Sequence, residues 1–262
     1  MADKTNSWEK VILFSQRILP VVVFFLAWEL VSRMELVNPR LFPAPTIVWS
    51  ALVEWLRSGE MWRDIKASYW RMLAGYFLGA FLGVGLGMMT GRNEFINKSL
   101  SPVIQLLRPL PPVAIIPLII VWLGIGDTAK IFSISFAVFF PVWINTHLGA
   151  SSVAPIYFWS AQVLCRSKFK IMMQVLLPAV LPSIVAGLRT AIAIAFVMVY
   201  VAEIAGASSG IGYQISVTHL AYRIDKMMAA LLVLASAGAF ADFLFAQAIR
   251  LAFPWTKLER KA

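Results

Sequence analysis

The sequence predicts an all-α polytopic membrane protein with about six transmembrane helices. Of its 262 residues, 60% are hydrophobic and only 14% are charged, and the mean hydropathy is +0.78. A soluble domain has about 45–50% apolar and about 25% charged residues, so this much apolar surface cannot be hidden in one water-soluble core. Basic residues flank the long apolar segments, as membrane orientation requires.

The N-terminal part carries the first predicted span, residues 18–31, after a polar leader. No small-residue cleavage pattern follows this span, which argues against the alternative of a cleavable signal peptide. Glu29, near its end, should face protein or the membrane interface. Prolines between residues 38 and 45 predict turns, after which Thr46 is expected to cap a short amphipathic helix. Mixed charges at 60–71 favour a solvated or interfacial helix leading into the second span.

The second predicted span, about residues 72–89, has a glycine at every fourth position from 75 to 87. Residues four apart lie on one face of a helix, and small residues at this spacing let two helix backbones approach closely in a membrane. We therefore expect this face to pack against another helix. The four glycines are Gly75, Gly79, Gly83 and Gly87.

The third predicted span, about residues 101–123, follows a short polar turn at 90–98 and is interrupted by Pro109, Pro111, Pro112 and Pro117. A broken helix is tolerated in a membrane only where protein or a water-filled cavity supplies hydrogen-bond partners. Arg108 lies beside the break. It either faces a bundle interior or an aqueous path, or extends to the cytoplasmic headgroups.

The last three predicted spans cover about residues 128–147, 184–205 and 227–249, and the final two contain Arg189, Glu203 and Asp242. The two carboxylates either form a proton relay or satisfy backbone and arginine partners in a bundle. The small-residue loop at 206–212 follows no strand, so it fails the context of a nucleotide-binding fingerprint. With one cysteine and two histidines, we expect no metal site and no intramolecular disulfide.

A basic segment separates the fourth and fifth spans, and we name residues 150–182 the polar island. It carries Arg166, Lys168 and Lys170 but no acidic residue. Loop charges place the island and both chain termini on the cytoplasmic side. The expected organisation is a leader, first span and amphipathic segment at 1–70, a core with five further spans at 71–250, and a cytoplasmic tail at 251–262. The net charge of +10 does not indicate nucleic-acid binding, because the basic residues form no stripe with interleaved aromatics.

Several motifs resemble the permease subunit of type I ABC importers, and the similarity covers nearly the whole chain. The branch most similar is the one that handles nitrate, sulfonates, taurine and bicarbonate. The matching segments are residues 41–45, residues 104–149 with the Gly124-Ile125-Gly126-Asp127 turn, Leu177-Pro178, Gly187-Leu188-Arg189, Ala202-Glu203 and residues 206–213.

This resemblance implies a type I ABC importer permease fold in the cell inner membrane, with a cytoplasmic coupling helix that docks on a separate ATP-binding subunit. The implied partners are a second permease copy, two ATP-binding subunits and an extracytoplasmic substrate-binding protein. ATP and Mg²⁺ belong to the partner subunit, so we expect neither a cofactor nor enzymatic activity of this chain. The residues expected to dock are Tyr157, Trp159, Ser160, Ala161, Cys165, Arg166, Lys168, Phe169 and Lys170.

The island departs from the family's coupling pattern, which reads Glu-Ala-Ala, three residues, then Gly. Trp159 stands where the Glu is usual and Cys165 where the Gly is usual, whereas Ala161 matches. Our hypothesis is that Trp159 replaces the charged contact by apolar burial, and that the neighbouring basic residues supply charge.

The expected substrate is a small anion such as nitrate, bicarbonate, or a sulfonate or taurine-like solute. Arg108 and Arg189 would give a translocation path positive potential, and with Glu203 they are the candidates to line it. Two other classes stay open, which are an ion-coupled secondary transporter and a non-transporting membrane scaffold.

Overall fold

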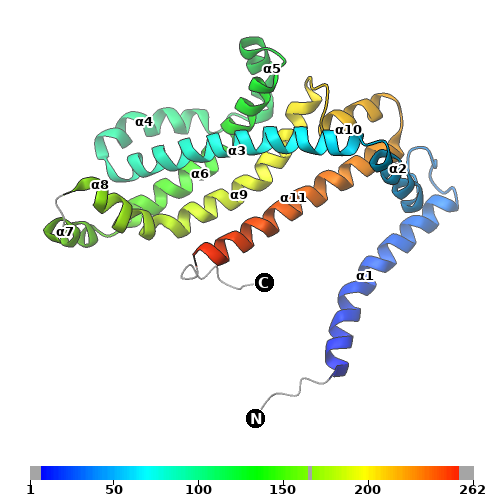
Figure 1. Ribbon diagram of the computed structural model, residues 1–262, viewed down its shortest axis with the longest axis horizontal. Coiled ribbons are helices and arrows are strands. Elements are labelled where there is room, and N and C mark those ends of the chain that lie inside the picture. The colour runs from blue at the N-terminus through cyan, green and yellow to red at the C-terminus, as the bar shows by residue number, and fades with distance from the viewer. Residues whose placement is uncertain (1–6, 165–166, 254–262) are drawn as a thin grey trace. The chain divides into compact units, whose positions relative to one another are not determined.

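The computed structural model describes residues 7–164 and 167–253, without the side chains of residues 7–18, 158, 164, 168 and 169. All regular secondary structure within these ranges is helical. The chain divides into two compact units, residues 1–61 with 215–232, and residues 62–214 with 233–262. Helices of both units are labelled in Figure 1.

The first unit contains α1 (Ser7–Arg33) and α2 (Pro45–Arg57), joined by a loop that folds back on α1. The Ser32 hydroxyl donates to the Phe42 carbonyl at 2.8 Å. The expected cap by Thr46 is wrong, because α2 begins at Pro45 and no side chain of its own caps it. Instead Glu29 of α1 accepts bonds from the Thr46 N–H at 3.2 Å and the Thr46 hydroxyl at 2.9 Å. A carboxylate at a helix N-terminus is favoured by the helix dipole.

The second unit is built on the close approach of α3 (Glu60–Arg92) and α6 (Asp127–Ser152), which run in the same direction. A Cβ added to Gly75, Gly83 or Gly87 would lie only 2.6–2.9 Å from the nearest α6 side chain, too close for any real Cβ. The four glycines at 75–87 therefore all lie against α6. The charged segment 60–71 belongs to the same uninterrupted helix.

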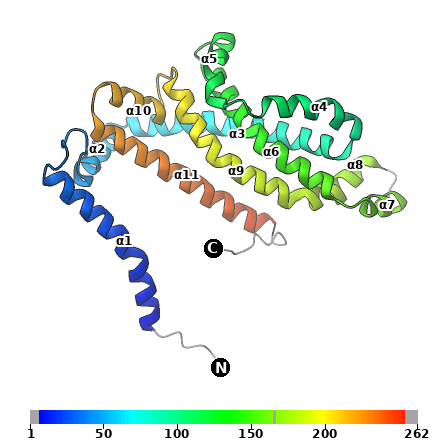
Figure 2. The ribbon, with the colours of Figure 1, turned by 180° about the vertical axis from the view of Figure 1, so that it is seen from behind.

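Helix α9 (Leu177–Ile204) packs antiparallel against α6 and completes the core of the second unit. Gly187 of α9 lies against Asn145, and Gly149 of α6 lies against Ser183. Figures 1 and 2 show α3, α6 and α9 side by side from opposite sides. The buried side chains that fill the space among them include Met72, Tyr76, Ile134, Val138, Ala191, Ala195 and Phe196.

The proline-rich third span is broken into α4 (Glu94–Leu107) and α5 (Pro112–Leu123), whose axes meet at 98°. The predicted polar turn is shorter than expected, because the Asn93 side chain accepts bonds from the N–H groups of Phe95 and Ile96 and starts α4 there. Helix α5 then packs on α6 and α9. The break lies where the prolines remove backbone donors.

Among the residues described with their side chains, four helical segments are long and apolar enough to cross a membrane, or five if α4 and α5 count as one broken span. They are α3, α6, residues 172–204 and α11 (Ile224–Ala252). The remaining predicted span, 18–31, lies in α1, whose side chains are described only from Leu19 onwards. Helix α10 (Ile211–Leu220) was not predicted.

Candidate functional site

The polar island folds into α7 (Pro155–Leu164), the short α8 (Lys168–Ile171) and the π-helix η1 (Met172–Leu176). Tyr157 and Trp159 of α7 are each 62% exposed, whereas Ala161 is buried. Large exposed aromatic side chains are typical anchors of protein–protein contacts. Ser160 and Lys170 are also exposed. Cys165 and Arg166 lie outside the described residues, as do the side chains of Lys168 and Phe169.

Within the island, the π-helical turn η1 leads directly into α9. The N–H of Leu177 donates to the carbonyl of Met172, five residues back, and Pro178, which has no N–H, follows. Single π turns are often found at functional sites. Residues 177–182, which the sequence assigned to the island, are already part of α9, so η1 continues directly into that helix.

Arg108 and Arg189, two candidates for the translocation path, have different surroundings. Arg108 is exposed at the end of α4, and among the described residues its side chain has no hydrogen bond or ion pair. Arg189 of α9 is half-exposed and pairs with Asp242 of α11 through two bonds, Nε to Oδ1 and Nη2 to Oδ2, both 2.9 Å long. The sequence left open whether the carboxylates of these spans satisfy arginine partners, and the structure pairs Asp242 with Arg189.

Glu203, the third candidate, is fully buried at the end of α9. Arg71 of α3 donates from Nη1 to Glu203 Oε1 at 2.7 Å, and from Nε to Asp127 Oδ1 at 2.7 Å. The hydroxyl of Ser68 lies 2.8 and 2.9 Å from the two Glu203 oxygens. Because every oxygen of Glu203 is paired within the protein, this carboxylate has no free surface to offer a solute in this conformation.

The same side chains fix the loop at 206–212 and the start of α10. Gly210 N–H donates to Asp64 Oδ1 at 2.9 Å, Ile211 N–H to Ser68 Oγ at 2.8 Å, and Gly212 N–H to Glu203 Oε2 at 2.8 Å. These donors would otherwise be unsatisfied at a helix N-terminus. Gly210 has a φ of +124°, and a Cβ there would collide with the Glu203 carboxyl, so the loop requires glycine at this position.

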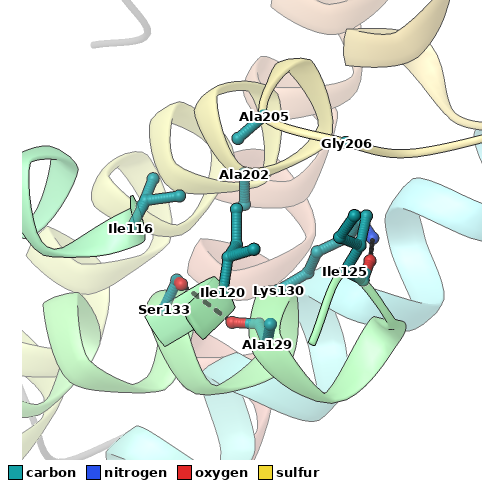
Figure 3. Close-up of a pocket in the computed structure, with 9 residues that line it drawn as sticks. All are labelled: Ile116, Ile120, Ile125, Ala129, Lys130, Ser133, Ala202, Ala205 and Gly206. Atoms are coloured by element: carbon teal, nitrogen blue, oxygen red, sulfur yellow. Dashed lines mark hydrogen bonds between the residues drawn. The ribbon is translucent and has the colours of Figure 1, made fainter. Parts of the chain in front are cut away.

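A small cavity lies beside this cluster, between α5, α6 and the end of α9 (Figure 3). Ile116 and Ile120 line one side, and Lys130 donates from Nζ to the carbonyls of Ile125 at 2.6 Å and Gly126 at 3.2 Å. Its volume of about 10 Å³ holds at most one water molecule, so it is not a solute site. No cluster of metal-ligating residues occurs in the part of the chain that the structure describes.

Sequence reasoning missed the residues that hold Glu203. Asp64, Ser68 and Arg71 were assigned to a solvated or interfacial helix because their segment mixes charges of both signs. Their spacing of four and then three residues places them on one face of α3, and this spacing could have indicated that they act together. The face is buried, since Asp64, Ser68 and Arg71 are all almost fully inaccessible to solvent.

Known proteins resemble this chain over most of its length. A family model described as the binding-protein-dependent transport system inner membrane component matches residues 75–251. A Bacillus subtilis protein, provisionally named an aliphatic sulfonates transport permease protein, is 32% identical over 91% of this chain and 84% of its own length. The taurine transport system permease protein of Escherichia coli is 28% identical over 82% of this chain and 80% of its own. The nitrate import permease protein of Synechococcus elongatus is 35% identical over 57% of this chain and 54% of its own.

Among solved structures, an inward-facing conformation of the MetNI methionine ABC transporter aligns with a TM-score of 0.59 at 19% sequence identity. The alignment covers 76% of this chain and 97% of that chain. At such low identity the likeness concerns the fold alone. The all-helical ABC importer permease fold predicted from the sequence is confirmed.

Proposed function

This chain belongs to the family of binding-protein-dependent transport system inner membrane components, and from that premise we propose that it forms the translocation path of an ATP-driven importer for a small anion. The observation that carries the proposal is the pair of exposed aromatic residues on α7, joined through η1 to the helix that crosses the whole second unit. Such a surface suits the binding of a partner subunit that changes the conformation of the translocation path without being part of it.

Coupling to an ATP-binding subunit follows from the chemistry of the island. Trp159 takes the position where the family has Glu, and its exposed indole buries in an apolar groove of the partner. Lys170 is exposed nearby, and the island contains no acidic residue, so the rim of that groove is acidic. ATP and Mg²⁺ are bound by the partner, and this chain binds no cofactor.

The anion assignment is supported by the relatives named for sulfonate, taurine and nitrate transport, and by two arginines at membrane depth. Arg108 lies 15 residues beyond Asn93, about 22 Å along α4. The hydrocarbon core of a bilayer is about 30 Å thick. An exposed arginine at this depth faces water or protein rather than lipid, and it gives the path positive potential. Glu203 does not contact the anion but stabilises one end of the path through its bonds to Arg71 and the Gly212 N–H.

Both chain termini and the island lie on the cytoplasmic side in this proposal, and the loop at 206–212 lies on the opposite side. The assembly contains two permease copies and two ATP-binding subunits in the inner membrane, and an extracytoplasmic binding protein delivers the anion. Two contacts support this two-sided arrangement. Arg92 at the end of α3 donates to the Val153 carbonyl at the island, and Arg71 joins Asp127 and Glu203 at the other end of the bundle.

Co-purification with an ATP-binding protein is the decisive test, because neither a secondary transporter nor a scaffold requires such a partner. Trp159→Ala should reduce both the co-purified partner and the coupled ATPase activity. Trp70→Ala is the matched control, since Trp70 is 63% exposed on α3, away from the island. Equal retention of the partner and of ATPase coupling by the two variants would refute docking through Trp159.

Uptake into proteoliposomes then separates the function classes. An importer loses uptake on ATP depletion, an ion-coupled transporter keeps it, and a scaffold shows none in any condition. Arg108→Ala and Arg189→Ala should each slow anion uptake in complexes that assemble normally. Unchanged uptake in both variants would exclude a role for these arginines in the path.

A further inference from the structure

The ion pair between Arg189 and Asp242 lies near the middle of two membrane-spanning helices. Arg189 follows the start of α9 by 12 residues and precedes its end by 15, about 18 and about 22 Å along the axis. Asp242 lies 18 residues after Ile224 and 10 before Ala252 on α11. Nevertheless the two side chains are 48% and 43% exposed in the chain.

Contact with lipid does not account for this exposure. A charged pair at membrane depth belongs against protein or water. The exposed neighbours of Arg189 on α9 are the small residues Ala186, Thr190 and Ala193. By contrast, α3 exposes Phe77 and Phe81, which suit lipid. The exposed side chains next to Arg189 on α9 are thus small, unlike the aromatic ones that α3 exposes.

The geometry of the pair is that of oxyanion recognition. Arginine binds a carboxylate through two parallel N–H···O bonds, as Arg189 does here with both distances at 2.9 Å. The same fork fits any oxyanion that presents two oxygens side by side, including nitrate, bicarbonate and a sulfonate group. Asp242 therefore occupies the donors that a passing oxyanion would use.

We propose that Arg189 is an oxyanion subsite of the translocation path and that Asp242 is its built-in competitor. This inference rests on the proposed function and adds the residue that sets how tightly the anion is held. An arriving anion exchanges with the Asp242 carboxylate on the guanidinium, and Asp242 pairs with Arg189 again as the anion leaves. Conduction requires binding that is favourable enough to admit an ion and weak enough to release it, and the competing carboxylate supplies the weakness.

The test uses the assembled complex of this chain with its ATP-binding subunits and takes nitrate and ethanesulfonate as probes. Anion binding is measured as the concentration that half-maximally raises the melting temperature, and transport as ATP-dependent uptake of the labelled probe. Asp242→Asn keeps the shape of the side chain and removes its charge. It should lower the half-maximal concentration about fivefold, the upper range for an exposed ion pair, and slow uptake.

Two further variants complete the design. Arg189→Gln should abolish the effect of both anions on melting, whereas Arg189→Lys, which keeps the charge and loses the fork, should weaken it. Glu54→Gln is the matched control, because it removes a carboxylate from another ion pair of the chain, Lys226–Glu54 at 2.8 Å. This control should leave the anion response unchanged.

An identical anion response in the wild type and Asp242→Asn would overturn the proposal. So would loss of association between permease copies in Asp242→Asn with no change in anion response, which would make the pair an interface between copies. If the wild-type complex shows no ATP-dependent uptake, the proposed function itself fails. If the wild type imports the probe and Arg189→Gln imports it equally well, only the subsite fails.

Discussion

Replacing Gly79 by alanine should separate two helices that now touch through their backbones. A Cβ at this position would lie 2.5 Å from the Ser135 carbonyl oxygen and 2.9 Å from Val138 Cβ, whereas real Cβ atoms do not approach closer than 3.0 Å. A backbone oxygen cannot rotate away, so α3 and α6 must move apart by at least 0.5 Å, the difference between the 2.5 Å contact with the Ser135 oxygen and the 3.0 Å limit. Overpacking of this kind costs about 1–3 kcal/mol.

The chain offers a matched control on the same helix. Gly85 has nothing within 4 Å of the position that a Cβ would take. Both substitutions gain the same helix propensity, about 1 kcal/mol, so the difference between Gly79→Ala and Gly85→Ala isolates the cost of overpacking. A difference of about 2 kcal/mol corresponds to about 4–8 °C in Tm for a chain of this size.

Thermal unfolding of both variants in lipid nanodiscs, followed by intrinsic fluorescence, measures this gap. We expect Gly85→Ala to melt at or above the wild type and Gly79→Ala to melt clearly below it. Equal melting temperatures for the two variants would refute the conclusion that the glycine face of α3 is closed by α6.

Three other substitutions test the remaining architecture. Glu203→Gln should lower stability by about 3 kcal/mol, because it leaves the buried guanidinium of Arg71 with Asp127 as its only carboxylate partner. The control Glu94→Gln breaks an exposed pair with Lys98 and should change Tm little. Equal changes in Tm would contradict a stabilising role for the buried pair of Arg71 and Glu203. Gly210→Ala should cost more than Gly59→Ala, since both require a positive φ but only the first meets a carboxyl group, and melting curves of the two variants decide. The hydrogen bond from Lys226 holds the pKa of the Glu54 carboxyl below its usual value of 4.5, so its stabilising effect is present above that value and is lost as the pH falls through the lowered pKa. The Tm difference between wild type and Glu54→Gln should therefore vanish on acidification, and a difference that persists at low pH would exclude this origin.

The sequence identified the face of α3 that would be closed, because glycines four apart need no knowledge of the partner helix. It could not identify α6 as that partner, since periodicity reports which side is buried and not what covers it. The parallel course of α3 and α6 depends instead on α4 and α5 carrying the chain back between them. The broken third span was predicted for the same local reason as the glycine face, because each proline removes its own donor.

The charged groups show where prediction stopped. Glu203 was recognised as unusual within an apolar segment, but its partner Arg71 lies 132 residues away in sequence. Long-range pairing of this kind follows from tertiary packing, which local composition does not contain. Glu29 is a similar case, because it caps a helix that begins 16 residues later, where a threonine next to the helix start was the obvious local choice.

The continuity of helix α9 has a mechanical consequence that could not be predicted from its sequence. It runs without interruption for 28 residues, about 42 Å, from the π turn within the island to the turn that contains Glu203. Midway along the helix, Tyr76 of α3 donates to the Leu188 carbonyl at 3.0 Å, and near its far end Arg71 of α3 donates to Glu203. A displacement of η1 would therefore be carried along one continuous helix to Glu203 and, through the bonds of Tyr76 and Arg71, to α3.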